Sequence, residues 1–262
     1  MQQPLHHCSR AQIYQRAIEL RRTGKLYDPA NAALDDVFRG SVDRFCAIAD
    51  RLRRCRRVLD VGAGHGMLLA LLHELGHECR AVDFTDQSGL YPHVYRARGI
   101  PFHVCNVEIE PLPFGEAAFD AVVCCQVLEH FTHSHLPAML EMHRVLNPDG
   151  VIEIDVPNVA SFRNRSRMLR GKNITYDYRE HYLYAKPILY KGHSFYPLRH
   201  NREFTQHELQ DLLKAARFRE IEVRYLKSRR HREGLERLRS IGTAIKDAIP
   251  SLRKSLIAFA RK

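Results

Sequence analysis

The sequence predicts an α/β fold in which a doubly wound sheet of seven strands carries helices on both faces. Apolar, β-branched runs alternate with helical patterns along the chain, which is typical of sheets whose strands are connected by helices. The first run, Val58 to Val61, passes through a glycine-rich turn into a helical pattern that stops at Gly76. The run from Phe119 to Gln126 has the apolar character of a parallel strand buried on both faces.

Composition indicates one globular α/β domain with additions. The chain has 262 residues, of which 45% are hydrophobic and 27% charged, ordinary values for a globular protein. No apolar run approaches 18 residues, and the N-terminus lacks the apolar core of a signal peptide. The seven cysteines contain no Cys-x-x-Cys pair, which argues against a disulfide framework and a zinc ribbon. The expected compartment is therefore a reducing cytoplasm.

The net charge of +11 is unevenly distributed. Residues 161–262 hold 25 Lys and Arg against 10 Asp and Glu, a net of +15, whereas residues 1–160 hold 16 against 20, a net of −4. This excess is either a solvated basic surface or a contact for an anionic partner such as phosphate, nucleic acid or a membrane face. The charge distribution indicates a positive electrostatic field around this segment, but it does not identify the partner.

Two amphipathic helical patterns precede the first strand, over residues 9–22 and about 33–53. We predict that residues 1–54 form an N-terminal helical cap and that residues 55–262 form the sheet domain. The two helices either cover the cofactor or substrate cleft or simply pack on the sheet.

The glycine turn after the first strand predicts a site for a nucleoside cofactor. Glycine allows a sharp turn and lets a ligand approach the backbone. Asp83, at the tip of the second strand, is placed to accept hydrogen bonds from a ribose. Met67 occupies the position of the third glycine of the dinucleotide fingerprint, so the pattern differs from that of a dinucleotide site.

The remaining elements follow from periodicity, turn chemistry and capping. Thr205 and Glu208 form a capping box at the start of a late helix. Residues 159–204, between the fifth strand and this helix, are rich in tyrosine and arginine and are here named the insertion. The expected elements are strands at 79–84, 101–105, 151–157, 218–225 and 255–261, helices at 90–98, 136–146 and 205–216, a turn at 147–150, and basic helices within 229–249.

Three segments together resemble the class I S-adenosylmethionine-dependent methyltransferases. They are the motif Asp60-Val-Gly-Ala-Gly-His-Gly66, the stretch from Asn106 to Asp120 with its Leu-Pro-Phe and Phe-Asp pairs, and the run from Arg144 to Asn158. The resemblance covers residues 56–158 and 203–262. It implies the strand order 3-2-1-4-5-7-6 with the last strand antiparallel, and S-adenosylmethionine as the cofactor.

The same resemblance implies which residues bind that cofactor. Asn106 stands where the family usually has Asp, and its carboxamide oxygen can still accept from an adenine amino group. The predicted cofactor-binding residues are Asp60, Gly62, Ala63, Gly64, Gly66, Asp83, Phe84, Asn106, Val107, Glu108 and Gln126.

His130 is the first candidate for a general base, because it follows the fourth strand at the edge where open α/β sheets bind ligands. Alternatively, the Glu129-His130 pair only orders the loop over the cofactor. His193 and His200, in the insertion, are rival candidates. The pair His73 and His77 has zincin-like spacing, but Gly76 ends the helix between them, so no metal site is expected.

The predicted function is methyl transfer to an oxygen or nitrogen of a small molecule, a saccharide or a lipid-linked glycan. The segment after the fourth strand lacks the Pro-Pro-Tyr and Pro-Cys motifs of base methylation, so a nucleic-acid acceptor is not expected. Residues 159–204 should build the acceptor site, and the basic segment should contact an anionic membrane at its inner face. The alternative is a methyltransferase-fold protein that binds an anionic partner without turnover. The sequence leaves the oligomeric state open.

Overall fold

The computed structural model describes residues 8–28, 30–175, 177–227 and 248–262. Its main feature is one seven-stranded sheet with the order β3-β2-β1-β4-β5-β9-β8, which confirms the predicted fold class. The strands are β1 Arg57–Val61, β2 Glu78–Asp83, β3 Phe102–Val104, β4 Phe119–Cys125, β5 Leu146–Pro157, β8 Arg219–Leu226 and β9 Ser255–Arg261. The helices are α1 Arg10–Arg22, α2 Ala32–Arg51, α3 Met67–Glu74, α4 Tyr95–Arg98, α5 His135–Val145, α6 Phe162–Met168 and α7 Gln206–Ala215.

The last strand lies between the fifth and sixth strands of the sheet, as expected. β9 pairs antiparallel with β5, where Ile154 faces Ala258, and antiparallel with β8, where Val223 faces the same alanine. The two additional strands, β6 Ile188–Tyr190 and β7 His193–Phe195, form a separate hairpin within the insertion. The chain end therefore closes the sheet by joining β5 to β8.

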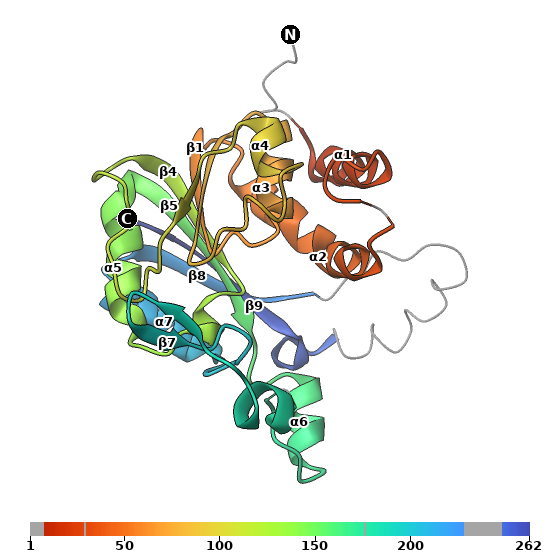
Figure 1. Cartoon of the computed structure of the whole chain (residues 1–262), viewed down its shortest axis with the longest axis vertical. Helices are drawn as coiled ribbons and strands as arrows, with labels where there is room; N and C mark the ends of the chain where they lie inside the picture. The colour runs from red at the N-terminus through yellow and green to blue at the C-terminus, as the bar shows by residue number, and fades with distance from the viewer. Residues whose placement is uncertain (1–7, 29, 176, 228–247) are drawn as a thin grey trace.

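Helices cover both faces of the sheet, and alternate residues of the central strands reach the two layers (Figure 1). In β4, Ala121 and Val123 pack with α1, α2 and α3, whereas Val122 and Cys124 pack with α5 and α7. This alternation follows from the two-residue period of a strand. A strand buried on both sides has to be apolar throughout, as its sequence indicated.

The two N-terminal helices share the core of the sheet domain. Ser9 and Gln12 form a capping box that starts α1, and the Asn31 side chain caps α2. Phe38 and Val42 of α2 are fully buried in the same cluster as α3 and β1. The boundary at residue 54 stays a prediction.

Two local expectations were wrong. The helix expected at 90–98 covers only α4: Pro92 disfavours helical backbone at the residue before it, Tyr91, and residues 92–94 form turns. The turn expected at 147–150 lies inside β5 as a bulge, where Phe119 pairs with Leu146 and Ala121 with Val151. Asp149 takes a positive φ of 64° there.

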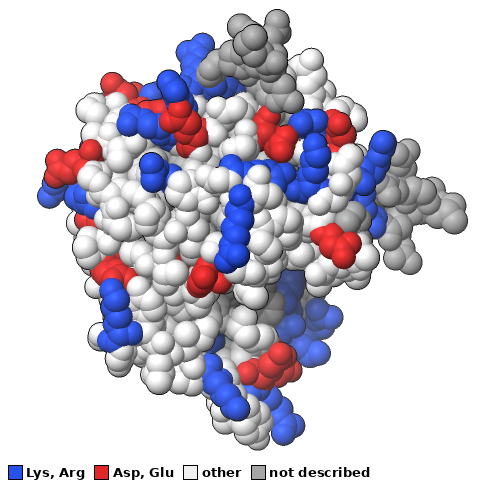
Figure 2. All heavy atoms as spheres, turned by 45° about the horizontal axis from the view of Figure 1, so that its top comes forward, with Lys and Arg blue, Asp and Glu red and all other residues white. Residues whose placement is uncertain are grey.

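The insertion carries α6, a short π-helical turn at Arg179–Leu183 and the β6–β7 hairpin, and α6 projects from the rest of the molecule (Figure 1). Figure 2 shows Lys and Arg side chains around the lower part of the face that it presents, with fewer Asp and Glu between them. The basic helices expected within 229–249 fall almost entirely outside the described residues. In the described parts of the chain, no helix combines the length and apolar character needed to cross a bilayer.

Candidate functional site

The glycine turn after β1 uses its three glycines in two ways. A Cβ atom on Gly62 would lie 2.2 Å from a methyl group of Val127, and one on Gly66 would lie 2.7 Å from Val94. These two positions exclude any side chain because the turn packs closely. Gly64 has a φ of +51°, and no atom of the described residues lies within 4 Å of the position its Cβ would take. Its backbone is therefore open to a ligand.

Hydrogen bonds hold this turn from two directions. The Gly64 amide donates to Asp83 Oδ2 at 3.0 Å, and the Tyr95 hydroxyl donates to the Gly64 carbonyl at 2.7 Å. Asp83 Oδ1 also accepts from the Thr85 amide at 3.3 Å. The carboxylate at the end of β2 is thus fixed against the turn at the end of β1, at the carboxyl edge where such sheets bind ligands.

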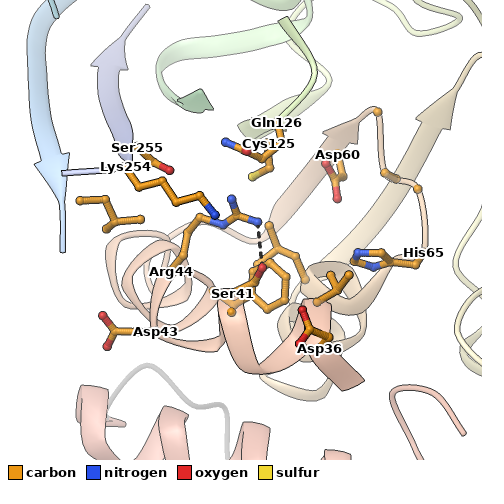
Figure 3. A pocket seen from close by; sticks show the side chains of 18 of the residues that line it. Asp36, Ser41, Asp43, Arg44, Asp60, His65, Cys125, Gln126, Lys254 and Ser255 are labelled. Atoms are coloured by element: carbon orange, nitrogen blue, oxygen red, sulfur yellow. Dashed lines mark hydrogen bonds between the residues drawn. The ribbon is translucent and has the colours of Figure 1, made fainter. Parts of the chain in front are cut away.

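Two cavities meet at this turn, and Gly62 and Gln126 line both. The smaller cavity, of about 170 Å³, lies over the ends of β2 and β4 and is bordered by Asp83, Asn106 and His130. The larger cavity, of about 500 Å³, lies between the turn, α2 and the start of β9 (Figure 3). A cofactor with a nucleoside at one end and a charged chain at the other fits such a pair.

The larger cavity contains an unpaired buried carboxyl group. Asp60 is 3% exposed, and its Oδ1 has no hydrogen-bond partner among the described residues. Burial, reinforced by the charges of Asp83 and Asp155, raises its pKa to about 8. Buried polar atoms in proteins are normally paired, so this oxygen fits a cationic or hydrogen-bond-donating ligand in the cavity.

Arg44, on α2, interacts with two further buried carboxyl groups, those of Asp155 and Glu153. Its Nη1 donates to Asp155 Oδ1 at 2.9 Å, and the side-chain Nε2 of Gln126 donates to the same oxygen. Glu153, also on β5, is fully buried, and burial together with Asp155 raises its pKa well above the usual value. Figure 3 shows the Arg44 side chain between Lys254 and Ser41.

The structure brings most of the predicted cofactor residues to the cavities. Ten of the eleven line one or both, and Gly66 instead packs under Val94 and Tyr95. The Asn106 carboxamide oxygen accepts from the Glu108 amide at 3.0 Å, and Glu108 Oε2 accepts from the Thr132 amide at 2.7 Å. Both residues therefore also order the loops around the smaller cavity. Their contacts with a cofactor stay predictions.

The three candidate bases occupy different environments. His130 lines the smaller cavity, and its Nδ1–H donates to the Arg199 carbonyl at 2.8 Å. Burial lowers the pKa of His130 to about 4, so its imidazole is neutral at pH 7. The His200 ring lies 4.8 Å from the His130 ring, centroid to centroid, whereas His193 lies exposed on the β6–β7 hairpin.

The ring of His77 forms a structural contact, because its Nδ1–H donates to the Cys55 carbonyl at 2.8 Å within the core. His73 and His77 belong to neither of the two groups of metal-binding side chains found among the described residues.

Sequence reasoning did not single out several residues that the structure places around the cavities. Glu153 and Asp155 could have been identified from the sequence, because acidic residues are rare in a strand that is buried on both faces. The residues not identified from the sequence are Ser41, Arg44, Phe195, Lys254 and Ser255, which line a cavity, and Glu153 and Asp155, which interact with Arg44.

Comparisons with known proteins agree with this geometry. Residues 33–223 match a methyltransferase domain family. A probable S-adenosylmethionine-dependent methyltransferase of Mycolicibacterium smegmatis is 32% identical over 111 residues, 42% of each chain. A probable tRNA methyltransferase 9B of Mus musculus is 34% identical over 105 residues, 38% of this chain. The matched stretches thus cover less than half of these relatives, 42% and 21% of their lengths.

Solved structures share the fold at low sequence identity. An S-adenosylmethionine-dependent methyltransferase from Archaeoglobus fulgidus superimposes with a TM-score of 0.55 at 19% identity, covering 88% of this chain and 98% of the other. A Burkholderia thailandensis N-methyltransferase, solved with 1,6-didemethyltoxoflavin and S-adenosylhomocysteine, has a TM-score of 0.52 at 21% identity, covering 97% and 91%. The predictions of family and cofactor are confirmed, and the chain belongs to the methyltransferase domain family.

Proposed function

We propose that this protein transfers the methyl group of S-adenosylmethionine to an oxygen or nitrogen of a small polar molecule, a saccharide or a lipid-linked glycan. The observation that carries the proposal is the pair of cavities that meet at Gly62 and Gln126. One cavity would hold the nucleoside, beside Asp83. The other would hold the charged chain of the cofactor, beside Asp60, together with the acceptor.

The carboxyl groups around the cavities suit a cationic cofactor. When bound, S-adenosylmethionine supplies a methyl group on a positively charged sulfur, which makes the methyl carbon electrophilic. Asp60, Glu153 and Asp155 all interact with one guanidinium of the described residues, that of Arg44. Since these groups lie in a low-dielectric interior, a cation entering beside them is favoured. Asp83, held by Gly64, would accept from the ribose hydroxyls.

The acceptor would enter through the larger cavity. Its wall carries hydrogen-bonding and charged groups from α2 and from the start of β9, among them Ser41, Arg44, Lys254 and Ser255. Such groups suit an acceptor with several hydroxyls, and the cations suit one that also bears a phosphate or carboxylate. Aligning the acceptor atom with the methyl carbon can supply ~7–11 kcal/mol of the rate enhancement.

The insertion supports an acceptor presented at a membrane. Residues 161–202 hold ten Lys and Arg against two Asp and Glu. Nine of the thirteen exposed large apolar side chains in the described residues lie between Phe162 and Leu198, and Leu169 is 89% exposed. A surface that combines exposed apolar and basic side chains fits an anionic lipid face. We propose peripheral contact through this insertion, and through the basic segment at 229–249 that the sequence indicated.

Three arginines at the start of the insertion, Arg163, Arg165 and Arg167, line neither cavity. Arg165 Nε donates to the Ala160 carbonyl at 2.7 Å, and Arg167 Nε donates to the Asn173 carbonyl at 2.7 Å. Both guanidinium groups thus form hydrogen bonds within the insertion. The residues of the insertion that do reach the smaller cavity are Phe195, Tyr196 and Pro197.

Two measurements test the proposed function. Calorimetry should show S-adenosylmethionine binding, and Asp83→Ala should weaken it by ~1.5–3 kcal/mol, the range for a hydrogen bond to a charged group. Labelled S-adenosylmethionine should then transfer its label to one class in a screen of saccharides, lipid-linked glycans, phenols and amines. Cofactor binding without transfer to any acceptor would favour the alternative, a binding protein without turnover. Absence of cofactor binding would refute both.

A further inference from the structure

Three side chains with metal-binding atoms meet at the edge of the smaller cavity. Glu129 and His130 belong to the 3-10 turn Leu128–His130 that follows β4, and His200 belongs to the segment that leads to α7. One ligand atom from each side chain lies within 4.8 Å of the other two. Their ligand atoms are close enough for one ion to bridge all three after small side-chain rotations.

Backbone hydrogen bonds hold the two segments together. The Glu129 carbonyl accepts from the Asn201 amide at 2.7 Å and from the Arg202 amide at 3.2 Å. The Asn201 side chain donates to the His130 carbonyl at 2.9 Å. His200 is therefore fixed beside a turn that lies 70 positions earlier in the sequence, and the arrangement does not depend on a ligand.

The carboxylate of Glu129 is buried, and no hydrogen bond to it is found among the described residues. The residue is 1% exposed, and neither Oε1 nor Oε2 has a hydrogen-bond partner in the described parts of the chain. Burying such a group unpaired costs several kcal/mol, and a carboxylate with both oxygens unsatisfied is uncommon in a folded protein. The position therefore calls for a proton or a cation.

The imidazole of His130 is oriented as a metal ligand. Its Nδ1–H is committed to the Arg199 carbonyl, so Nε2 carries the free lone pair. Metal-binding histidines usually donate their other ring N–H in this way, which fixes the tautomer and the ring direction. Glu203 Oε1 lies 3.5 Å from His200 Nδ1 and can hold the second imidazole similarly.

We propose that Glu129, His130 and His200 bind one divalent transition-metal cation at the edge of the cofactor cavity. Two imidazoles and one carboxylate suit Mn²⁺, Fe²⁺, Co²⁺ or Zn²⁺ better than Mg²⁺ or Ca²⁺, which prefer oxygen ligands. Binding does not depend on the proposed methyl transfer. It does give His130 a different role, because a nitrogen that ligates a metal cannot also accept a proton from the acceptor.

A second group, Cys125, Glu153 and Asp155, is less suited to a cation. Arg44 already donates to Asp155, and the Cys125 thiol lies 3.2 Å from Glu153 Oε2, where it donates a hydrogen bond. One oxygen of each carboxyl group is thus already engaged in a hydrogen bond within the cluster.

The test uses tag-free, full-length protein stripped with a chelator and dialysed. Co²⁺ is titrated by calorimetry, and its visible absorption is followed at the same time. We expect one Co²⁺ per chain. Glu129→Gln and His200→Ala should each weaken the affinity for Co²⁺ at least ~100-fold, because losing a residue that only supports a metal ligand already costs up to ~100-fold. His207→Ala is the matched control, since this exposed α7 histidine pairs only with Asp211 among the described residues, and its affinity should equal that of the unaltered protein.

Circular dichroism of each metal-free variant shows whether it has folded. If His200→Ala does not fold, the near-isosteric Glu129→Gln carries the test. Absence of stoichiometric Co²⁺ binding in the unaltered protein would overturn the proposal, and so would binding of equal strength in folded Glu129→Gln protein.

Discussion

Arg44 and Asp155 form an ion pair between the N-terminal helices and the centre of the sheet. Arg44 Nη1 on α2 lies 2.9 Å from Asp155 Oδ1 on β5, and the two residues are 111 positions apart. The Arg44 side chain is 16% exposed, and that of Asp155 is fully buried. Because Arg44 also lines the larger cavity, the pair connects the packing of α2 to the shape of the site.

Removing this guanidinium should destabilise the fold strongly. Arg44→Met keeps an apolar stem but leaves Asp155 as an uncompensated buried charge, which typically costs 3–5 kcal/mol, so we expect a loss of about that size in the free energy of unfolding. Urea denaturation at pH 7 measures it. Arg51→Met, on the same helix, removes an exposed pair with Glu222 and should cost less than about 1 kcal/mol. Equal losses in the two variants would contradict this account.

A side chain at Gly64 should block the cofactor. Gly64→Val places a branched side chain in the space where the backbone is open to the cavity, so S-adenosylmethionine affinity should fall at least tenfold in calorimetry. Gly99→Val is the control for backbone strain, because Gly99 has a φ of +62°, has no atom within 4 Å of its Cβ position and lines neither cofactor cavity. Similar cofactor affinity in the two variants would argue against the assigned site.

Cofactor binding should tighten as the pH rises. The pKa of Asp60 is raised to about 8, so the carboxyl is mostly protonated at pH 7. A cationic cofactor favours the ionised form, so binding near pH 7 should release a proton and the dissociation constant should fall between about pH 6 and pH 8. Calorimetry in two buffers with different ionisation enthalpies counts the proton. In Asp60→Asn protein the proton release should disappear.

The same group should affect the stability of the cofactor-free protein. A folded-state pKa above the unfolded value of 3.8 means that the contribution of Asp60 to stability is fully present below that value and is lost as the pH rises through about 8. Urea denaturation of the unaltered protein and of Asp60→Asn should therefore diverge over this interval. The variant should have the smaller loss of stability.

The exposed insertion should govern membrane contact. Leu169→Glu places a charge on an exposed apolar side chain beside Arg170, so the fraction of protein that sediments with anionic phosphatidylglycerol vesicles should drop severalfold. Leu90→Glu is the control, because Leu90 is 69% exposed but lies between β2 and α4, outside the insertion. Neutral phosphatidylcholine vesicles should retain little protein. Equal sedimentation of both variants with anionic vesicles would refute contact through the insertion.

The sequence by itself determined most elements of the sheet domain, because their signals are local. Ser9 and Thr205 start helices through side-chain bonds three residues away, and both capping boxes are present in the structure. The glycine turn depends on neighbouring residues, and the apolar run of β4 reflects burial on two faces. The order of the sheet followed from the family resemblance, and Asp83 was correctly placed at the carboxyl end of β2.

Only the tertiary structure decided which distant side chains share the site. Arg44 and Asp155 lie on different layers of the molecule, and His200 lies beside Glu129, 71 positions earlier, because the next two residues donate to the Glu129 carbonyl. The periodicity of apolar residues does not predict such long-range contacts, because they depend on how helices and loops pack once the sheet has formed. His77, whose spacing from His73 is zincin-like, forms a hydrogen bond to the Cys55 carbonyl in the core. The buried carboxylate of Glu129 lies beside His130 and His200 only in the folded chain, because burial and the contacts of its oxygens depend on distant segments.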